Sequence, residues 1–215
     1  MIIIFGTKDL AEMSKFYFEQ QGKKVLAFVQ DEEFIEENIF CGLPVFPFEN
    51  IEKNYPPENV EFFAPLSGVK MNTVRESIYN KIKAKKYKMP TYIHETAHVW
   101  DKDALGENCF IQELNNIQFN TWVGNNVVMW AGNHIGHHGN IGHHVFFTSH
   151  VVLSGHCVVG DNCWFGVNST IKDFTTLKSG TLVAMGAMIT KDTESWKFYL
   201  GSPARSRGDS MDIEL

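Results

Sequence analysis

The chain has 215 residues, of which 44% are hydrophobic and 20% charged, and its net charge at pH 7 is -6. The acidic balance argues against nucleic acid as the main partner, because binding to a phosphate backbone requires a basic face. No apolar stretch approaches the length of a membrane span, and the N-terminus lacks the features of a secretory leader. The four cysteines form no CxxC pair, so we expect a reduced, cytoplasmic protein. The length of the chain fits one large domain or two modest ones.

The first third of the chain predicts alternating strands and helices. Residues 2–5 are an apolar run that predicts a buried strand, followed directly by Gly6. The next segment predicts a helix, because apolar residues recur there at helical spacing: Leu10, Met13 and Tyr17. Residues 25–29 predict a second strand, and Asp31 follows its end. This βαβ opening is typical of a Rossmann-like nucleotide domain.

Further elements complete this first domain. Residues 62–66 predict another strand, and Ser67-Gly68 precedes a helix. The apolar face expected for that helix is Met71, Val74, Ile78 and Ile82. Only Gly6 stands where a dinucleotide fold shows three glycines, so we expect a pocket for a nucleotide-linked sugar rather than a nicotinamide or flavin cofactor. We therefore predict a Rossmann-like nucleotide-sugar-binding domain over residues 1–88 and a second domain over residues 89–215.

The second domain carries a repeat of six residues. From Ile93 to Ile189, every sixth residue is apolar, which makes seventeen positions without a break in register. This period fits neither a helix nor an amphipathic strand, and it is typical of short strands joined by tight corners, three to each coil of eighteen residues. The apolar residue points inward. Glycine often follows it, as at Gly136 and Gly142, and we expect these glycines to supply special backbone angles at the corner.

Histidines gather in one part of this repeat, with seven of the nine between residues 134 and 156. Each six-residue repeat, or hexad, is counted from its apolar residue. We expect the third and fourth residues of each hexad at a corner, facing outward, which places His137 and His138 together. One coil later, Gly155 stacks over His137 and His156 over His138, about 4.8 Å away. We expect His143, His144 and His156 to be solvated corner residues.

The pairing of His137 with Gly155 favours acyl transfer. A histidine side chain is suited to take a proton from an attacking amine or hydroxyl near neutral pH. A backbone N–H at Gly155 would stabilise the oxyanion that develops on the acyl carbonyl, since glycine allows close approach. A groove along the stacked corners would hold an extended thioester cofactor.

The sequence resembles bacterial sugar acyltransferases that join a small Rossmann-like domain to a left-handed parallel β-helix, among them sialic acid O-acetyltransferases and the N-acetyltransferase of bacillosamine biosynthesis. The resemblance covers nearly the whole chain and is strongest over residues 133–168 and in Gly201-Ser202-Pro203-Ala204-Arg205. It implies the left-handed β-helix and a homotrimer with active sites between subunits. Large outward aromatic residues suit such a packed face: Trp122, Trp130, Phe146 and Trp164.

The resemblance also implies site residues. The family's catalytic base, a histidine before an acidic residue, falls on His137, and the acidic neighbour is replaced here by His138. The acetyl-carbonyl contact falls on Gly155. Further acetyl-CoA contacts are expected at Gly166, Ala184 and Gly186. The nucleotide contacts are expected at Gly6, Thr7, Lys8, Asp31, Ser67 and Gly68, with Lys8 replacing backbone donors that a poor glycine turn does not supply.

The favoured interpretation is an acetyl-CoA-dependent N-acetyltransferase acting on a nucleotide-linked amino sugar, without a metal. The sugar amine attacks the thioester directly while His137 removes its proton. One alternative is O-acetylation of a sugar or sialic acid. A second is a γ-class carbonic anhydrase with zinc on His138 and His143, against which the expected third ligand position is Lys102. A third is a non-catalytic sugar-binding or assembly protein.

Overall fold

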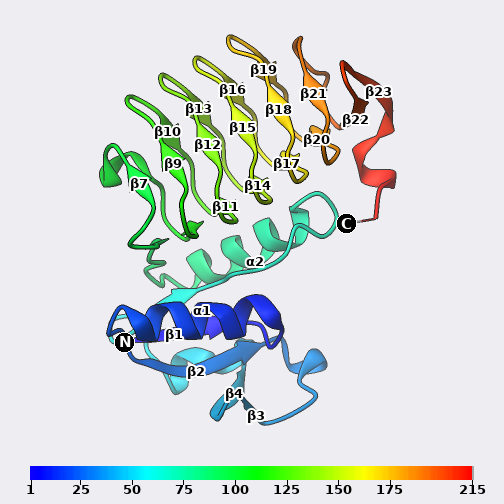
Figure 1. Cartoon of the computed structure of the whole chain (residues 1–215). Coiled ribbons are helices and arrows are strands. Elements are labelled where there is room, and N and C mark those ends of the chain that lie inside the picture. The colour runs from blue at the N-terminus through cyan, green and yellow to red at the C-terminus, as the bar shows by residue number, and fades with distance from the viewer. Residues whose placement is uncertain (215) are drawn as a thin grey trace. The chain divides into compact units, whose positions relative to one another are not determined.

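The computed structural model describes residues 1–214 (Figure 1). The chain divides into two compact units, one made of Met1–Ser67 with Ser77–Pro90 and the other of Gly68–Glu76 with Thr91–Leu215. None of the helices in the described part of the chain combines the length and the apolar character that crossing a membrane requires.

The first unit contains a five-stranded sheet in the order β3-β4-β2-β1-β5. The strands are β1 (Ile2–Phe5), β2 (Val25–Gln30), β3 (Ile39–Phe40), β4 (Leu43–Pro47) and β5 (Glu61–Phe63). Strand β1 pairs in parallel with β2 and β5, β2 pairs in parallel with β4, and only the β3–β4 pair is antiparallel. The carboxyl ends of β1, β2 and β5 therefore meet at one edge of the sheet.

Helices α1 (Asp9–Gln20) and α2 (Thr73–Ala84) and the short 3-10 helices η1 (Glu32–Phe34) and η2 (Phe48–Lys53) complete the N-terminal part. The expected apolar face of α2 is only partly correct. Ile78 and Ile82 are buried in the core of the first unit, but Val74 is 42% exposed. The neighbouring Arg75, which belongs to the second unit, is buried instead. Its guanidinium donates hydrogen bonds to backbone carbonyls in the coils of the same unit.

Short strands that recur at six-residue spacing build the second unit. They are β6 (Tyr92–Ile93), β7 (His98–Val99), β8 (Phe110–Ile111), β9 (Asn116–Ile117), β10 (Trp122–Val123), β11 (Val128–Met129), β12 (His134–Ile135), β13 (Asn140–Ile141), β14 (Phe146–Phe147), β15 (Val152–Leu153), β16 (Val158–Val159), β17 (Trp164–Phe165), β18 (Thr170–Ile171), β19 (Thr176–Leu177), β20 (Leu182–Val183) and β21 (Met188–Ile189). Helix η3 (Lys102–Ala104) interrupts an early coil, and β22 (Lys197–Gly201), β23 (Ala204–Asp209) and η4 (Ser210–Asp212) end the chain.

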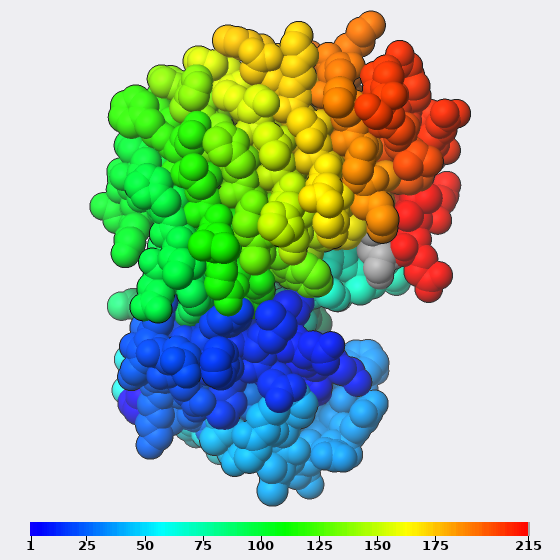
Figure 2. Space-filling model, in the orientation of Figure 1, coloured from blue at the N-terminus to red at the C-terminus, as the bar shows by residue number. Residues whose placement is uncertain are grey.

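These strands form three parallel faces around one core. The first face runs from β6 to β20 and is extended by β22 and β23, the second runs from β7 to β21, and the third from β10 to β19. Pairing joins residues eighteen apart, as in His134 with Val152 and Asn140 with Val158, so each coil has eighteen residues as expected. The architecture is that of a parallel β-helix and is consistent with the left-handed kind; Figures 1 and 2 show its coils stacked side by side.

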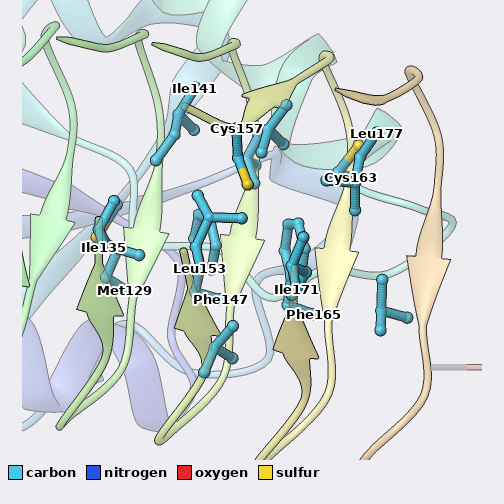
Figure 3. Packing of buried hydrophobic residues seen from close by; sticks show 14 of the residues in the cluster. Met129, Ile135, Ile141, Phe147, Leu153, Cys157, Cys163, Phe165, Ile171 and Leu177 are labelled. Carbon is cyan, nitrogen blue, oxygen red and sulfur yellow. The ribbon is translucent and has the colours of Figure 1, made fainter. Parts of the chain in front are cut away.

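The inward positions of successive coils stack into columns (Figure 3). Ile135, Leu153 and Ile171 are fully buried in one column, and the rings of Phe147 and Phe165 stack in another with centroids 4.5 Å apart. Three of the four cysteines also lie in the core, and burial raises the pKa of the Cys109 thiol to about 11. Apolar burial along this narrow prism is therefore the main stabilising contribution to the repeat.

The corner glycines have a different role from the one expected. The positive φ lies at the fourth residue of the hexad, for example 55° at His138 and 58° at Asn126. The glycine that follows the apolar residue instead allows adjacent coils to approach, since a Cβ on Gly136 would lie 2.5 Å from the carbonyl carbon of Ser154 and one on Gly124 would lie 2.6 Å from the oxygen of Gly142. The expectation of special backbone angles at these glycines was wrong.

Each face is followed by a corner, numbered here like the face before it. The third corner, which includes residues 142–145, is covered by residues 68–76 of the same compact unit. Asn72 donates from Nδ2 to the carbonyls of Asn162 and Cys163, at 3.2 and 3.1 Å. His144 is consequently only 7% exposed, and the prediction that it is solvated was wrong.

The same segment also covers part of the expected aromatic face. Phe146 is buried and its ring lies 5.6 Å from the Arg75 guanidinium carbon, while Gly68 packs against the Trp164 ring. These two aromatic residues belong to the first face, whereas Trp122 belongs to the third and is 52% exposed. The four outward aromatic residues therefore do not form one surface open to a partner.

The buried His144 predicts a pH dependence of stability. Burial lowers the pKa of its imidazole from 6.5 to about 4, so between these values the unfolded chain binds a proton that the folded chain does not. Stability contributed by this residue is therefore complete above pH 6.5 and is lost as the pH falls toward 4. His144→Asn copies the residue found at Asn126 and Asn162, one coil away on either side.

We expect the thermal midpoint of the wild type to fall more than that of His144→Asn between about pH 7.5 and about pH 5. Thermal unfolding followed by circular dichroism at both pH values measures this difference. Parallel pH profiles for the two proteins would show that His144 does not titrate differently in the folded and unfolded chains.

Candidate active site

The second corner carries the candidate base. His137 and His138 follow strand β12, and both side chains are exposed. They line an open pocket of about 560 Å³ together with four other residues: His98, Asn116, Gln118 and Phe119. The pocket thus combines imidazole and amide groups with an aromatic ring, as expected for a site that orients a polar substrate.

Gly155 lies directly against His137. Strands β12 and β15 pair with a shift of eighteen residues, and the His156 N–H donates to the carbonyl of His137 at 2.9 Å. A Cβ on Gly155 would come within 2.8 Å of Cε1 of the His137 ring. The imidazole therefore occupies space that only glycine leaves open at this position.

The amide of Gly155 is available for a ligand. Within residues 1–214, no group of the protein accepts a hydrogen bond from this N–H. Equivalent amides of the third corner are bonded: Asn125 N–H donates to Nδ1 of His143 at 2.9 Å, and His143 N–H donates to Oδ1 of Asp161 at 2.6 Å. A donor left open beside an imidazole is the arrangement that stabilises a developing oxyanion.

His138 contacts His137 through its ring. The two Nδ1 atoms lie 3.0 Å apart, so one of them must donate a proton to the lone pair of the other. Further rings pack against these two histidines. The ring centroids of Phe119 and His138 lie 5.6 Å apart, those of His138 and His156 4.9 Å, and those of His156 and Phe174 4.5 Å. The prediction missed Phe119 and Phe174, although both lie eighteen residues from a histidine of this corner.

Gly155→Ala is expected to reduce acetyl transfer by about 10²-fold, because the new methyl group displaces the His137 ring by roughly 1 Å. The thermal midpoint should change little, since an exposed side chain can move away. Steady-state rates with Ser154→Ala, one residue away, provide the matched control. A wild-type rate in Gly155→Ala would mean that the position of His137 against residue 155 does not matter.

The other candidate acetyl-CoA contacts lie at a different corner. Gly166, Ala184 and Gly186 belong to the first corner, and a Cβ on Gly166 would clash with the backbone of Met185. Gly186 has a φ of 66° and open space around it. The structure thus groups these three residues and leaves Gly155 one corner away, across the second face.

The first unit groups most of the candidate nucleotide contacts. Gly6, with a φ of 98°, donates from its N–H to the carbonyl of Val29 at 2.8 Å, and Thr7 and Lys8 follow it at the carboxyl edge of the sheet. Asp31 follows β2 at this edge, and one of its carboxylate oxygens lies 3.7 Å from Nζ of Lys81.

The two remaining candidate nucleotide contacts, Ser67 and Gly68, belong to different compact units. Ser67 is exposed in the first unit, but Gly68 is assigned to the second and its Cβ position lies 2.7 Å from the Trp164 ring. Gly68 therefore has a packing role in addition to any contact with a substrate. His138 and His143, the pair considered for the carbonic anhydrase alternative, lie on the second and third corners.

Comparison with solved structures identifies the fold. PerB from Caulobacter crescentus, solved with CoA and GDP-perosamine, has a TM-score of 0.85 at 20% identity over 96% of this chain and 97% of its own. The acetyltransferase domain of PglB from Neisseria gonorrhoeae has a TM-score of 0.82 at 19% identity, over 96% and 98% of the two chains. WeeI from Acinetobacter baumannii has a TM-score of 0.81 at 17% identity, over 96% and 99%.

No family model matches the sequence, and no curated protein matches it significantly. The structural likeness covers nearly the whole chain and shows that the fold is shared with these proteins, among them the acetyltransferase domain of PglB. The resemblance expected from the sequence is confirmed at the level of the fold.

Proposed function

We propose that this protein is an acetyl-CoA-dependent N-acetyltransferase that acts on a nucleotide-linked amino sugar. The observation that carries the proposal is the second corner, where the exposed His137 imidazole lies against Gly155 and its open N–H. The shared fold supports it, because PerB was solved with both CoA and GDP-perosamine. The same fold with a base and an oxyanion donor side by side fits acyl transfer better than simple sugar binding.

The reaction proceeds by direct attack. The sugar amine forms a bond to the thioester carbonyl carbon while His137 takes a proton from the nitrogen. The carbonyl oxygen becomes an oxyanion that accepts a hydrogen bond from Gly155 N–H. Collapse of this intermediate breaks the carbon–sulfur bond, and the imidazolium returns its proton to the leaving CoA thiolate. No covalent enzyme intermediate forms.

His138 orients the base. If His137 donates its Nδ1 proton to Nδ1 of His138 across the 3.0 Å separation, Nε2 of His137 keeps its lone pair for the amine proton. A neutral imidazole accepts this hydrogen bond without a negative charge. His138 therefore fixes the tautomer of His137, which is the role that the acidic neighbour fills in the sequences this chain resembles.

The binding regions are assigned on local geometry. Residues 1–88 are proposed as a Rossmann-like domain that holds the nucleotide, because parallel strands β1, β2 and β5 end at one edge, where α/β sheets bind such ligands. Lys8 is exposed at the start of α1 and offers a positive charge to a phosphate. Residues 89–215 are proposed as the acyltransferase domain, with CoA along Gly166, Ala184 and Gly186.

A homotrimer with active sites between subunits is part of the proposal. Apolar side chains around the second corner support it, since Phe174 is 71% exposed and Phe119 is 62% exposed beside His138 and His156. Monomeric proteins rarely leave such groups of aromatic residues open to water. Free cysteines and a co-substrate made in the cytoplasm lead us to place the enzyme in that compartment.

The experiment that tests the function measures free thiol release from acetyl-CoA with a panel of acceptors. The panel contains UDP-, dTDP- and GDP-linked 3-amino and 4-amino sugars, together with sialic acid. Turnover with an amino sugar supports N-acetyl transfer and names the substrate. Turnover with sialic acid alone would replace the proposal by O-acetylation, and turnover with none would overturn it.

A further inference from the structure

We propose that His137, His138 and His156 form a binding site for a divalent transition-metal ion of the zinc type, and that the bound ion switches off the candidate base. Metal binding stands on the geometry of the second corner alone. Only its effect on acetyl transfer rests on the proposed function.

The three imidazoles converge. One ring nitrogen from each can be chosen so that all three lie within 4.8 Å of one another, and the side chains are exposed to an incoming ion. Zinc binds imidazole nitrogens at about 2.0–2.1 Å, so two ligands of one ion lie at most roughly 4.2 Å apart. Ring rotations that move the nitrogens by less than 1 Å therefore bring the set to binding distance. No other group of three His, Cys, Asp or Glu side chains in residues 1–214 meets the same criterion.

The coils hold the backbone of these ligands in place. His138 and His156 are the fourth residues of stacked hexads, with φ values of 55° and 58°. The hydrogen bond from His156 N–H to the His137 carbonyl, at 2.9 Å, joins the two coils between the ligands. The His156 ring stacks on Phe174 at 4.5 Å with an interplanar angle of 5°. Little order has to be gained on binding, which favours affinity.

The ligand set indicates the kind of ion. Three neutral imidazoles without a carboxylate suit zinc, copper or nickel rather than calcium or magnesium, which prefer oxygen ligands. Three protein ligands leave a coordination position for water. His138 stands where the sequences this chain resembles have an acidic residue, so the ligand set depends on that departure.

Metal binding and base catalysis exclude each other at His137. A neutral imidazole has a single nitrogen with a free lone pair, because the other carries a proton. An ion that takes this lone pair leaves none to accept the amine proton. Zinc at saturating concentration is therefore expected to stop acetyl transfer, and a chelator to restore it.

The binding test uses the purified full chain. Zinc affinity is measured by competition with a chromophoric chelator, and the coordination is followed by the absorption of bound Co²⁺, for the wild type, His156→Ala and His138→Ala. His143→Asn is the control, because it removes an exposed corner histidine at another corner and inserts the residue found one coil earlier at Asn125. We expect one ion per chain in the wild type and the control, and at least about 10-fold weaker binding in the two site variants.

Equal affinity in the wild type and both site variants, or no binding in the wild type, would overturn the site. If His156→Ala does not fold by circular dichroism, His156→Asn replaces it, since Asn120 occupies the same corner position two coils earlier. In the activity arm, each protein's rate with zinc is divided by its own rate with chelator. We expect His156→Ala to require at least about 10-fold more zinc for the same inhibition.

The two proposals fail in different ways. Zinc binding without any acetyl transfer on the acceptor panel would leave the metal site standing and remove the proposed function. Acetyl transfer that zinc does not inhibit at concentrations that fill the site would overturn the switch.

Discussion

Replacing His137 by alanine is expected to lower kcat for acetyl transfer by about 10²- to 10⁴-fold, the usual contribution of a general base. The amine must lose a proton as it bonds to the thioester carbon, and the His137 imidazole lies beside the open Gly155 amide where that carbon would be held. Because the substitution removes the base and leaves the binding regions intact, KM for acetyl-CoA should change much less than kcat.

The measurement is steady-state thiol release with the best acceptor of the panel. His143→Asn provides the control, since it removes an exposed corner histidine but keeps a side chain that can accept from Asn125 N–H. We expect the control to retain the wild-type kcat. A His137→Ala enzyme with a wild-type kcat would show that another group, or water, takes the proton.

Replacing Arg75 by alanine is expected to lower the free energy of unfolding by about 3–5 kcal/mol. The guanidinium is fully buried, with Nη2 donating to the carbonyl of Asn126 at 2.7 Å and Nη1 to the carbonyls of His144 and Val145 at 3.4 Å. Burial lowers its pKa to about 9, which still leaves it charged at neutral pH. Alanine would remove the 2.7 Å donor of the buried Asn126 carbonyl, and a buried carbonyl left unsatisfied costs roughly 1–3 kcal/mol. The Val145 carbonyl would keep the N–H of Val128 as a donor, at 3.0 Å.

Urea denaturation of the full chain measures this change. Val74→Ala is the matched control, because its side chain lies next in sequence and is 42% exposed, so its effect should stay within about 0.5 kcal/mol. Arg75→Lys should lie between the two, since an ammonium keeps the charge but not the planar fork of donors. An Arg75→Ala protein as stable as Val74→Ala would mean that the carbonyls find other donors.

The repeat could be predicted from the sequence because its physical signal is periodic. One inward apolar residue per hexad is required on every coil, and the eighteen-residue pairing of His134 with Val152 follows from three hexads. The same spacing predicts that Gly155, eighteen residues after His137, lies against it. The spacing also links Phe174, eighteen residues after His156, to this corner, although Phe174 is not among the predicted site residues.

The parts that could not be predicted depend on what packs against the repeat. Hydrophobic spacing favoured Val74 on the buried face of its helix, yet the neighbouring surface is a row of backbone carbonyls, which need a donor such as Arg75. The same covering segment buries His144, whose hexad position alone predicts exposure. Local pattern identifies a corner, but it carries no information on which corner another segment will cover.

Transfer of an acetyl group to a sugar nitrogen can be followed directly with acetyl-CoA labelled with ¹³C in its acetyl group. The labelled compound is incubated with the wild-type protein and each nucleotide-linked amino sugar, and the product is followed by NMR and mass spectrometry. We expect one sugar to gain the label as an amide on its nitrogen, with one CoA thiol released for each acetyl group transferred. Label found only as an ester on oxygen, or label that remains on CoA with every sugar, would contradict it.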